Sequence, residues 1–259
     1  MNQQVEVEIE DGAEGRIRGA ETARRTLRLL EALAAHQPVR LDEVSELVGL
    51  NKSTAYRLLR VLQEEGYCER LPQGGYRLGG AVAALATRTA VPAATLEAMR
   101  PVLQELAEST AETVTVHRRA GETAVLAVGV ESEQHVLRQV VRVGETTPLT
   151  RGCAGIAILA SLPAGDRDEV VEHAGGSEAR SVLRTRIAEA LTDGYAVSRA
   201  ANHPGVLGIA TAVPGADGAG AELSLAVSGP ESRWTRDRAV EHADRLREAA
   251  ERLAHLAGW

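Results

Sequence analysis

The sequence contains no phenylalanine, only two cysteines and, at Lys52, a single lysine among its 259 residues. The two cysteines, Cys68 and Cys153, lie far apart, which rules out a framework of several disulfides and leads us to expect a cytoplasmic protein. No run approaches the roughly 18 consecutive apolar residues of a membrane-spanning helix, so we expect no membrane partner. Hydrophobic residues still make up 44% of the chain, which is enough for one large core or two ordinary ones.

The formal net charge of −7 is unevenly distributed along the chain. Residues 1–13 carry four acidic side chains and no basic one, and we expect 1–15 to be a disordered acidic tail. Residues 14–91 carry 12 basic against 9 acidic side chains, whereas 92–259 carry 17 against 23. An acidic chain with one basic module can bind nucleic acid, because affinity follows local phosphate contacts rather than overall charge.

The basic region shows three successive helical patterns. Apolar residues recur at helical spacing over 20–35, with Leu27 and Leu30 among them, then over 41–48 and over 52–66. Gly49 suits the positive φ of a turn between the second and third helices, and Asn51 or Ser53 is expected to cap the third.

Two short strand-like runs, 67–71 and 76–79, follow these helices and flank the turn 72–75, which predicts a β-hairpin. Three helices followed by a hairpin is the order of a winged helix-turn-helix domain, here over 16–79. Residues 80–91 are expected to form an alanine-rich linker helix, and Pro92 marks the start of a larger region, 92–259.

The third helix carries a candidate DNA-binding face, because no acidic residue occurs from Asn51 through Arg60. Hydroxyls and cations on the first turns of such a helix can reach base edges and phosphates in a major groove. The alternative is an ordinary solvated basic face. The candidate DNA-contacting residues are Lys52, Ser53, Thr54, Tyr56, Arg57 and Arg60 on the helix, Gln73 and Arg77 on the hairpin, and Arg16 and Arg18 in a basic arm ahead of the first helix.

The segment GLNKSTAYRLLRVLQEEGYCERLPQGGYRLG (49–79) closely resembles the DNA-binding region of the isocitrate-lyase-regulator (IclR) family of bacterial transcription factors. Two further segments, 142–163 and 193–233, resemble that family's downstream motifs in the correct order. The resemblance implies a winged helix followed by a GAF-like effector-binding domain, an antiparallel sheet flanked by helices. It also implies a homodimer, often assembled as a dimer of dimers.

The pattern of 92–259 agrees independently with an α+β fold of this kind. Residues 113–119 and 123–130 are predicted to pair as strands around a turn at Gly121-Glu122. No strand–glycine-rich loop–helix fingerprint occurs, which argues against a nucleotide-binding fold. The other expected elements are strands over 135–142, 206–213 and 222–229 and helices over 153–162, 179–194 and 235–258.

The resemblance implies that small carboxylic or aromatic effectors bind in the C-terminal domain. A helix beginning near Gly152 can hold a carboxylate with its free N–H groups, although small residues there also suit tight helix–sheet packing. Residues 198–201 lack the acidic side chains of family members that bind keto acids, so a bulkier, less polar ligand or a degenerate pocket remains open. The candidate effector-binding residues are Cys153, Ala154, Ser198, Val206, Gly208, Ala226, Ser228 and, beside them, Arg151.

The sequence therefore predicts a transcriptional regulator that binds a pseudo-palindromic double-stranded operator and responds to a small carboxylic acid, aromatic metabolite or lactone. Repression and activation use the same DNA contacts, so the sign of regulation stays open. In an alternative interpretation, the C-terminal domain is a ligand-free oligomerisation or protein-interaction module. We expect no enzyme, cofactor or metal: Cys153 with His117, His135 or His203 as base lacks any nucleophile signature, and no histidine stands three or four residues from a cysteine or another histidine.

Overall fold

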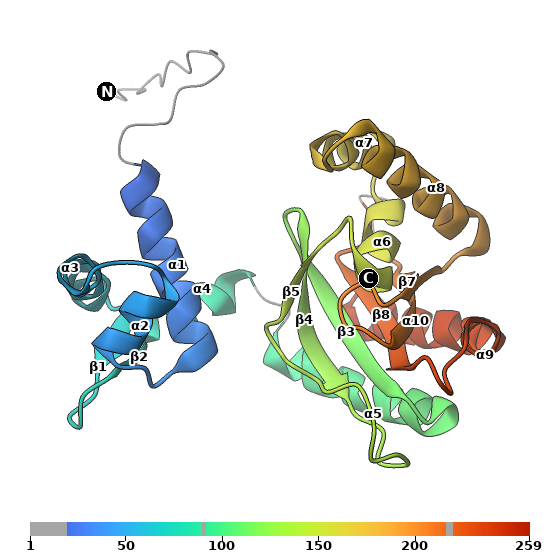
Figure 1. The fold of residues 1–259 in the computed structure, drawn as a ribbon. Coiled ribbons are helices and arrows are strands. Elements are labelled where there is room, and N and C mark those ends of the chain that lie inside the picture. The colour runs from blue at the N-terminus through green and yellow to red at the C-terminus, as the bar shows by residue number, and fades with distance from the viewer. Residues whose placement is uncertain (1–19, 90–91, 216–219) are drawn as a thin grey trace, which may run out of the picture. The chain divides into compact units, whose positions relative to one another are not determined.

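The computed structural model describes residues 20–89, 92–215 and 220–259. They form two compact units, one on either side of residues 90–91 (Figure 1). The expected acidic tail, 1–15, and the basic arm at Arg16 and Arg18 lie outside the described residues. Within the described part of the chain, no helix is both long and apolar enough to cross a lipid bilayer.

The N-terminal unit has the predicted order of helices and hairpin. Its core joins Leu29 and Leu33 of the first helix to Val44, Ala55 and Leu59 of the next two. The buried stripe of the first helix differs from the expected one, since Leu27 is 59% exposed and Leu29 and Leu33 replace it. The elements are α1 (Ala20–His36), α2 (Leu41–Leu47), α3 (Lys52–Glu64), β1 (Cys68–Arg70), β2 (Tyr76–Leu78) and α4 (Gly80–Thr89).

The turn between α2 and α3 sets the start of the third helix. Gly49 has φ +65°, a conformation that side chains with a Cβ rarely adopt. Asn51 is the N-cap, because its side-chain oxygen accepts a hydrogen bond from the Thr54 N–H at 2.8 Å. The Ser53 hydroxyl, the other expected cap, instead donates to the same Asn51 oxygen at 2.8 Å.

The C-terminal unit is built on a six-stranded antiparallel sheet with the strand order β5-β4-β3-β8-β7-β6. The predicted hairpin and the strands at 206–213 and 222–229 are present, which confirms the α+β class. The elements are α5 (Ala93–Thr110), β3 (Thr113–Ala120), β4 (Thr123–Val130), β5 (Thr146–Pro148), α6 (Gly152–Ser161), α7 (Ala164–His173), α8 (Ser177–Asp193), β6 (Ala196–Arg199), β7 (Val206–Val213), β8 (Leu223–Pro230), α9 (Arg236–Glu241) and α10 (Ala243–Ala257).

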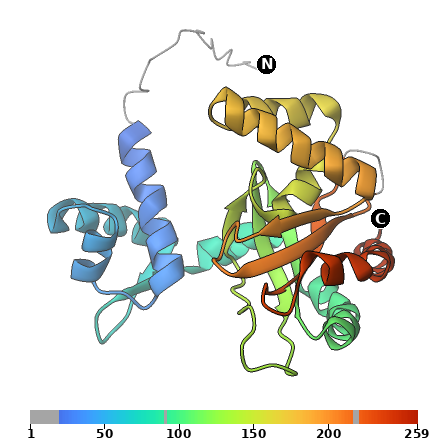
Figure 2. The same ribbon diagram turned by 45° about the vertical axis from the view of Figure 1, so that its right-hand side comes forward.

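Helices cover both faces of this sheet (Figures 1 and 2). On one face, α5 and α10 pack against alternate strand residues such as Val114, Val116 and Leu225. On the other, α6 and α8 pack against alanines of the strands, among them Ala210 and Ala226. The period-2 alternation of strands therefore sends bulky residues to one layer and small residues to the other. Small residues bring α6 close to the sheet.

Glycine makes that approach possible within α6 itself. A Cβ on Gly155 would lie 2.8 Å from the Pro148 carbonyl oxygen and 2.9 Å from the Leu149 Cα, closer than real Cβ contacts. The packing interpretation of this small-residue helix is thus confirmed for Gly155.

The strand predicted over 135–142 is wrong. Residues 131–145, which we call the strap, connect β4 to β5 without strand structure, and Val136 is 98% exposed. β5 pairs with β4 only over Thr123–Val125, and strap backbone groups bond to side chains, for example the Val141 N–H to Glu131 at 2.9 Å. Alternation of valine and arginine predicted a strand because the pattern carries no information on the backbone partners that the segment finds in the fold.

The single helix predicted over 235–258 is interrupted. α9 ends at Glu241 and α10 begins at Ala243, with His242 between them. His242 stacks on the fully buried Trp234, with ring centroids 5.6 Å apart. Apolar periodicity continues through the interruption, which is why the sequence gives no sign of it.

Candidate functional site

The exposed face of α3 presents most of the predicted DNA-contacting residues. Lys52, Ser53, Tyr56, Arg57 and Arg60 are exposed, and Thr54 is half-buried. Their positions follow from the opposite face, where Ala55, Leu59 and Leu62 are buried in the core of the unit. In the hairpin, Gln73 and Arg77 are also exposed. The structure thus places these side chains on α3 and the hairpin, while Arg16 and Arg18 lie outside the described residues.

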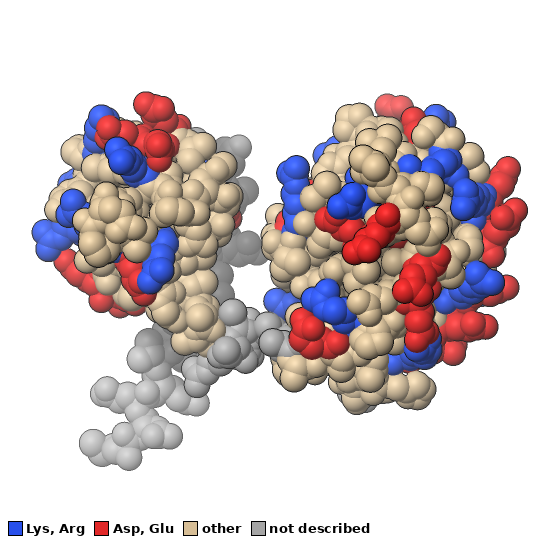
Figure 3. All heavy atoms as spheres, turned by 90° about the horizontal axis from the view of Figure 1, so that it is seen from below, with Lys and Arg blue, Asp and Glu red and all other residues tan. Residues whose placement is uncertain are grey.

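Most cations of this surface have an acidic partner within the unit. Lys52 Nζ lies 2.8 Å from Asp42, Arg60 lies 2.9 Å from Glu64, and Arg77 contacts Glu69 at 2.8 and 3.0 Å. Figure 3 likewise shows basic and acidic side chains side by side on the faces that it presents. Exposed pairs of this kind are weak and can be exchanged for phosphate.

Arg57 differs from these three cations, because it forms no ion pair with any carboxylate in the described part of the chain. It is exposed on the second turn of α3. An unpaired guanidinium on such a helix can form two hydrogen bonds with a guanine edge or bind a phosphate.

The second candidate site is a cavity of about 80 Å³ in the C-terminal unit, between the sheet and the first turn of α6. The strap contributes Gln139, Val140 and Glu145 to its wall. Seven of the eight predicted effector-binding residues line this cavity. They are Cys153, Ala154, Ser198, Val206, Gly208, Ala226 and Ser228.

Arg151, the eighth, is not among the lining residues. Its side chain is exposed, and its Nε donates a hydrogen bond to the Ala201 carbonyl oxygen. It therefore ties the start of α6 to the loop after β6. No lysine or arginine lines the cavity within the described residues.

The first turn of α6 approaches the strands closely at the cavity. The Cys153 N–H donates to the Ser198 hydroxyl oxygen at 2.9 Å. A Cβ on Gly208 would lie 2.7 Å from Cys153 Sγ and 2.9 Å from Ser228 Oγ, so a glycine is required there. The helix end supplies N–H groups and a partial positive charge, which suit an anionic group.

The titratable groups of the cavity are held uncharged or paired. Desolvation lowers the pKa of His117 to about 4, so its imidazole is neutral at pH 7. Burial raises the pKa of the Cys153 thiol, opposed by the hydrogen bond with Ser198. A protonated thiol is a poor nucleophile, which argues against catalysis by Cys153. At the wall, His203 Nε2 lies 3.3 Å from Glu145.

Sequence reasoning missed several lining residues, including Thr115, Glu145 and Asn202, and considered His117 only as a base. The alternation of side-chain directions along β3 would have indicated Thr115 and His117 as lining residues. Val114 and Val116 face the α5–α10 layer, so Thr115 and His117 must face the other layer, where the cavity lies. Among the described residues, no group of three or more histidine, cysteine or acidic side chains is arranged to hold a metal ion.

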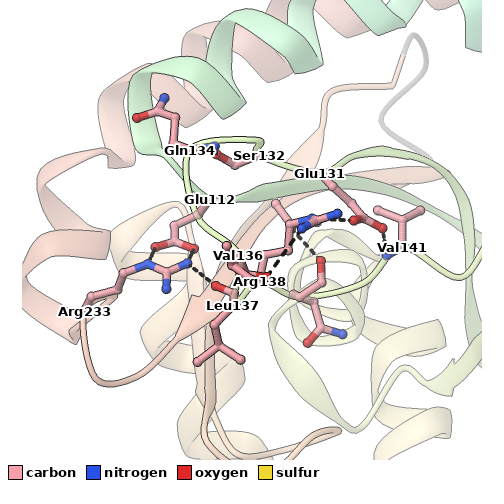
Figure 4. A network of polar contacts seen from close by, with 11 residues as sticks. Glu112, Glu131, Ser132, Gln134, Val136, Leu137, Arg138, Val141 and Arg233 are labelled. Carbon is pink, nitrogen blue, oxygen red and sulfur yellow. Dashed lines mark hydrogen bonds and ion pairs between the residues drawn. The ribbon is translucent and has the colours of Figure 1, made fainter.

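The strap that closes one side of the cavity is anchored by a polar network (Figure 4). Arg233 binds the buried Glu112 through two hydrogen bonds, at 2.7 and 2.9 Å, and donates to the Leu137 carbonyl oxygen at 2.8 Å. Glu131 binds Arg138, and the Thr113 hydroxyl donates to the Gln139 carbonyl oxygen at 2.7 Å. These contacts hold a segment that lacks strand pairing.

Comparison with known proteins gives consistent matches for both units. The family model of the IclR helix-turn-helix domain matches residues 22–72, and that of the bacterial transcriptional regulator IclR C-terminal domain matches 89–255. The chain is 30% identical over 230 residues to the HTH-type transcriptional regulator TtgV of Pseudomonas putida, covering 85% of each chain. It is 28% identical to the transcriptional repressor AllR of Klebsiella pneumoniae, covering 93% of this chain and 91% of the repressor.

Solved structures match over nearly the whole chain. An IclR transcriptional regulator from Silicibacter sp. TM1040 is 29% identical, with a TM-score of 0.73 over 92% of this chain and 96% of that one. An IclR homologue from Microbacterium hydrocarbonoxydans, in complex with 4-hydroxybenzoate, is 20% identical, with a TM-score of 0.70 over 92% of this chain and 99% of that one. The second likeness shows the fold alone.

Proposed function

The chain belongs to the IclR family of DNA-binding transcriptional regulators, and from this premise we propose that a small organic acid bound in its cavity controls binding to an operator. The observation that carries the proposal is the cavity beside the first turn of α6. It is lined by small and polar side chains and adjoins a helix end that favours an anion. The 4-hydroxybenzoate complex of the Microbacterium homologue supports an aromatic or related acid as effector.

On the DNA side, α3 is the recognition helix. Its exposed residues Ser53, Tyr56 and Arg57 would face base edges, while Lys52 and Arg60 exchange their carboxylate partners for phosphates. Gln73 and Arg77 of the hairpin would contact the backbone beside the helix. A homodimer would place two such helices in major grooves about 34 Å apart per helical turn, which requires a pseudo-palindromic operator. A dimer of dimers would engage two such elements.

On the ligand side, the carboxylate would bind at the first turn of α6, near Cys153, Ala154 and Ser198. The body of the ligand would occupy the space beside Val206, Gly208, Ala226 and Ser228. The ligand can shift operator affinity only through different affinities for the two arrangements of the protein. The volume of about 80 Å³ is smaller than the ~150 Å³ of a cavity that binds benzene, so a ring-sized ligand requires the cavity to widen.

The test uses the full-length protein and two measurements. Thermal unfolding is followed with keto acids, aromatic acids and lactones, because a ligand at 100 times its Kd stabilises by about 2.7 kcal/mol. Fluorescence anisotropy then measures binding to an operator selected by the protein from random duplex DNA. Ala154→Trp, which fills the cavity, should abolish the response to the ligand and leave operator affinity intact.

Either of two results contradicts the proposal. One is a ligand response that persists in a folded Ala154→Trp protein. The other is selective operator binding with no stabilisation by any compound of the panel, which favours a C-terminal domain that acts by oligomerisation or protein interaction.

A further inference from the structure

We propose that His117 is a specificity-determining residue of the cavity, and that it selects ligands bearing a hydroxyl group. The ligand class is then a hydroxylated organic acid. The inference rests on the proposed function, because it assumes that the cavity binds an organic acid. It adds a second point of recognition, on β3, one of the two middle strands of the sheet, to the one at the first turn of α6.

The first observation behind this proposal is the position of His117. Its imidazole lines the cavity, yet its Nδ1 is buried and has no hydrogen-bond partner. Across the β3–β8 ladder, His117 stands directly opposite Ser224, whose buried hydroxyl oxygen also has no partner. Ser224 does not line the cavity, so the polar group that a ligand can reach on this part of the wall is the His117 imidazole, through the part of the ring that lines the cavity.

The chemistry of the imidazole decides which ligand group suits this place. A neutral imidazole has one nitrogen that donates and one that accepts, and desolvation keeps His117 neutral by lowering its pKa to about 4. A hydroxyl both donates and accepts, so it can bond to either tautomer of the imidazole. A carboxylate can only accept, and its charge would be desolvated there without a compensating cation.

The remaining groups of the cavity direct the charged end of the ligand elsewhere. The lining residues of the described chain include no lysine or arginine, and the carboxylate of Glu145, paired with His203, would repel an anion. The first turn of α6 is the electropositive part of the wall, and it contacts β6 and β7 through Ser198 and Gly208. β8 separates β7 from β3, so the carboxylate and the hydroxyl would bind at opposite sides of the cavity.

The experiment compares acids that differ by one hydroxyl. Isothermal titration of the full-length protein uses benzoate with its 3- and 4-hydroxy derivatives, phenylacetate with mandelate, and propionate with lactate. In the wild type we expect at least one hydroxylated acid to bind about tenfold more tightly than its parent, which corresponds to about 1.4 kcal/mol. In His117→Leu this ratio should fall to near one. In His117→Gln, whose amide both donates and accepts, part of it should return.

The matched control is His242→Gln. His242 also has a buried Nδ1 without a partner, but it lies outside the cavity. This variant separates loss of an unpartnered imidazole from loss of a ligand contact, and it should keep the wild-type hydroxyl preference. Thermal unfolding of each variant confirms that the comparison is made on folded protein.

The outcomes distinguish the inference from the proposed function. If the parent acids bind, Ala154→Trp abolishes their binding, and the hydroxyl makes no difference, His117 has no such role although the cavity binds acids. A hydroxyl preference that is unchanged in both His117 variants refutes the inference in the same way. If no acid of the panel binds the wild type, the inference and the proposed organic-acid effector fail together.

Discussion

The anchor of the strap offers the sharpest test of the energetics in this fold. Arg233→Ala removes both hydrogen bonds to Glu112 and the one to the Leu137 carbonyl oxygen. The Glu112 side chain is 1% exposed, so the substitution leaves a buried carboxylate without its counter-ion. Breaking a buried pair by removing one partner costs about 3–5 kcal/mol. Because the Arg233 side chain is 22% exposed and water can enter in its place, we expect the lower end, about 3 kcal/mol.

Urea unfolding followed by tryptophan fluorescence measures this loss in the full-length protein. The only tryptophans of the chain are Trp234, which is fully buried beside Arg233, and Trp259. Both lie in the C-terminal unit, so the signal reports the unfolding of that unit.

A matched control and a second measurement make the test decisive. Arg184→Ala breaks an exposed pair with Glu172 and should change stability far less. Amide exchange over 136–143 should accelerate in Arg233→Ala and stay unchanged in Arg184→Ala, because Arg233 donates a hydrogen bond to the strap whereas Arg184 pairs with Glu172 on another element. A cost below about 1 kcal/mol for Arg233→Ala would refute the assignment of a buried, structurally required ion pair.

Three further predictions concern DNA, pH and helix capping. Arg57→Ala should weaken operator binding by about 1–3 kcal/mol if Arg57 contacts a base, or lower the slope of log K against log salt concentration by about one if it binds a phosphate. Arg60→Ala should have a smaller effect, because Arg60 is paired with Glu64. Equal effects of the two substitutions would contradict the distinction between an unpaired and a paired arginine. Because the pKa of His117 falls from 6.5 to about 4 on folding, stability should drop by about 3 kcal/mol as the pH falls from 6.5 to 4. Acid titration of His117→Leu should show a shallower loss, and an identical curve would exclude the effect. Asn51→Ala should destabilise the N-terminal unit by about 1 kcal/mol in thermal unfolding, whereas no change would mean that the cap contributes nothing.

The N-terminal unit was largely predictable because its structure is encoded locally. The helices α2 and α3 follow from apolar spacing, and Gly49 and Gly66, both with positive φ, mark the ends of helices. The wrong assignment of Leu27 to the buried face of α1 also comes from the use of apolar spacing alone. Spacing alone leaves two overlapping stripes on α1, and only packing against α3 selects the one with Leu29 and Leu33.

In the C-terminal unit, the errors arise where structure depends on distant partners. The 135–142 pattern suits a strand, yet side chains such as Glu131 and Arg233 bind the backbone of the strap. The helices α5 and α7 were not anticipated at all. In contrast, β3 and β4 were predicted because a hairpin needs only its own two strands and turn.

At the cavity, too, sequence motifs predicted some of the lining residues, while others became apparent only from the three-dimensional structure. The seven residues that line it as expected belong to motifs that resemble those of a family, and their assignment as ligand contacts stays a prediction. Arg151 was placed beside the helix start by sequence proximity, but its side chain turns to Ala201. His117 lies outside the motifs; the alternation of β3 indicates the face on which it lies, and the register of β3 against β8 places it opposite Ser224.

The carboxylate partners of Lys52, Arg60 and Arg77 have a consequence for how the regulator finds its target. Non-specific affinity for DNA comes almost entirely from cations that displace condensed counterions. Side chains already neutralised by neighbouring carboxylates displace fewer, so the protein should spend less time on the many competing sites of a chromosome. The full set of contacts would form only where α3 also matches the bases, which raises the ratio of specific to non-specific affinity.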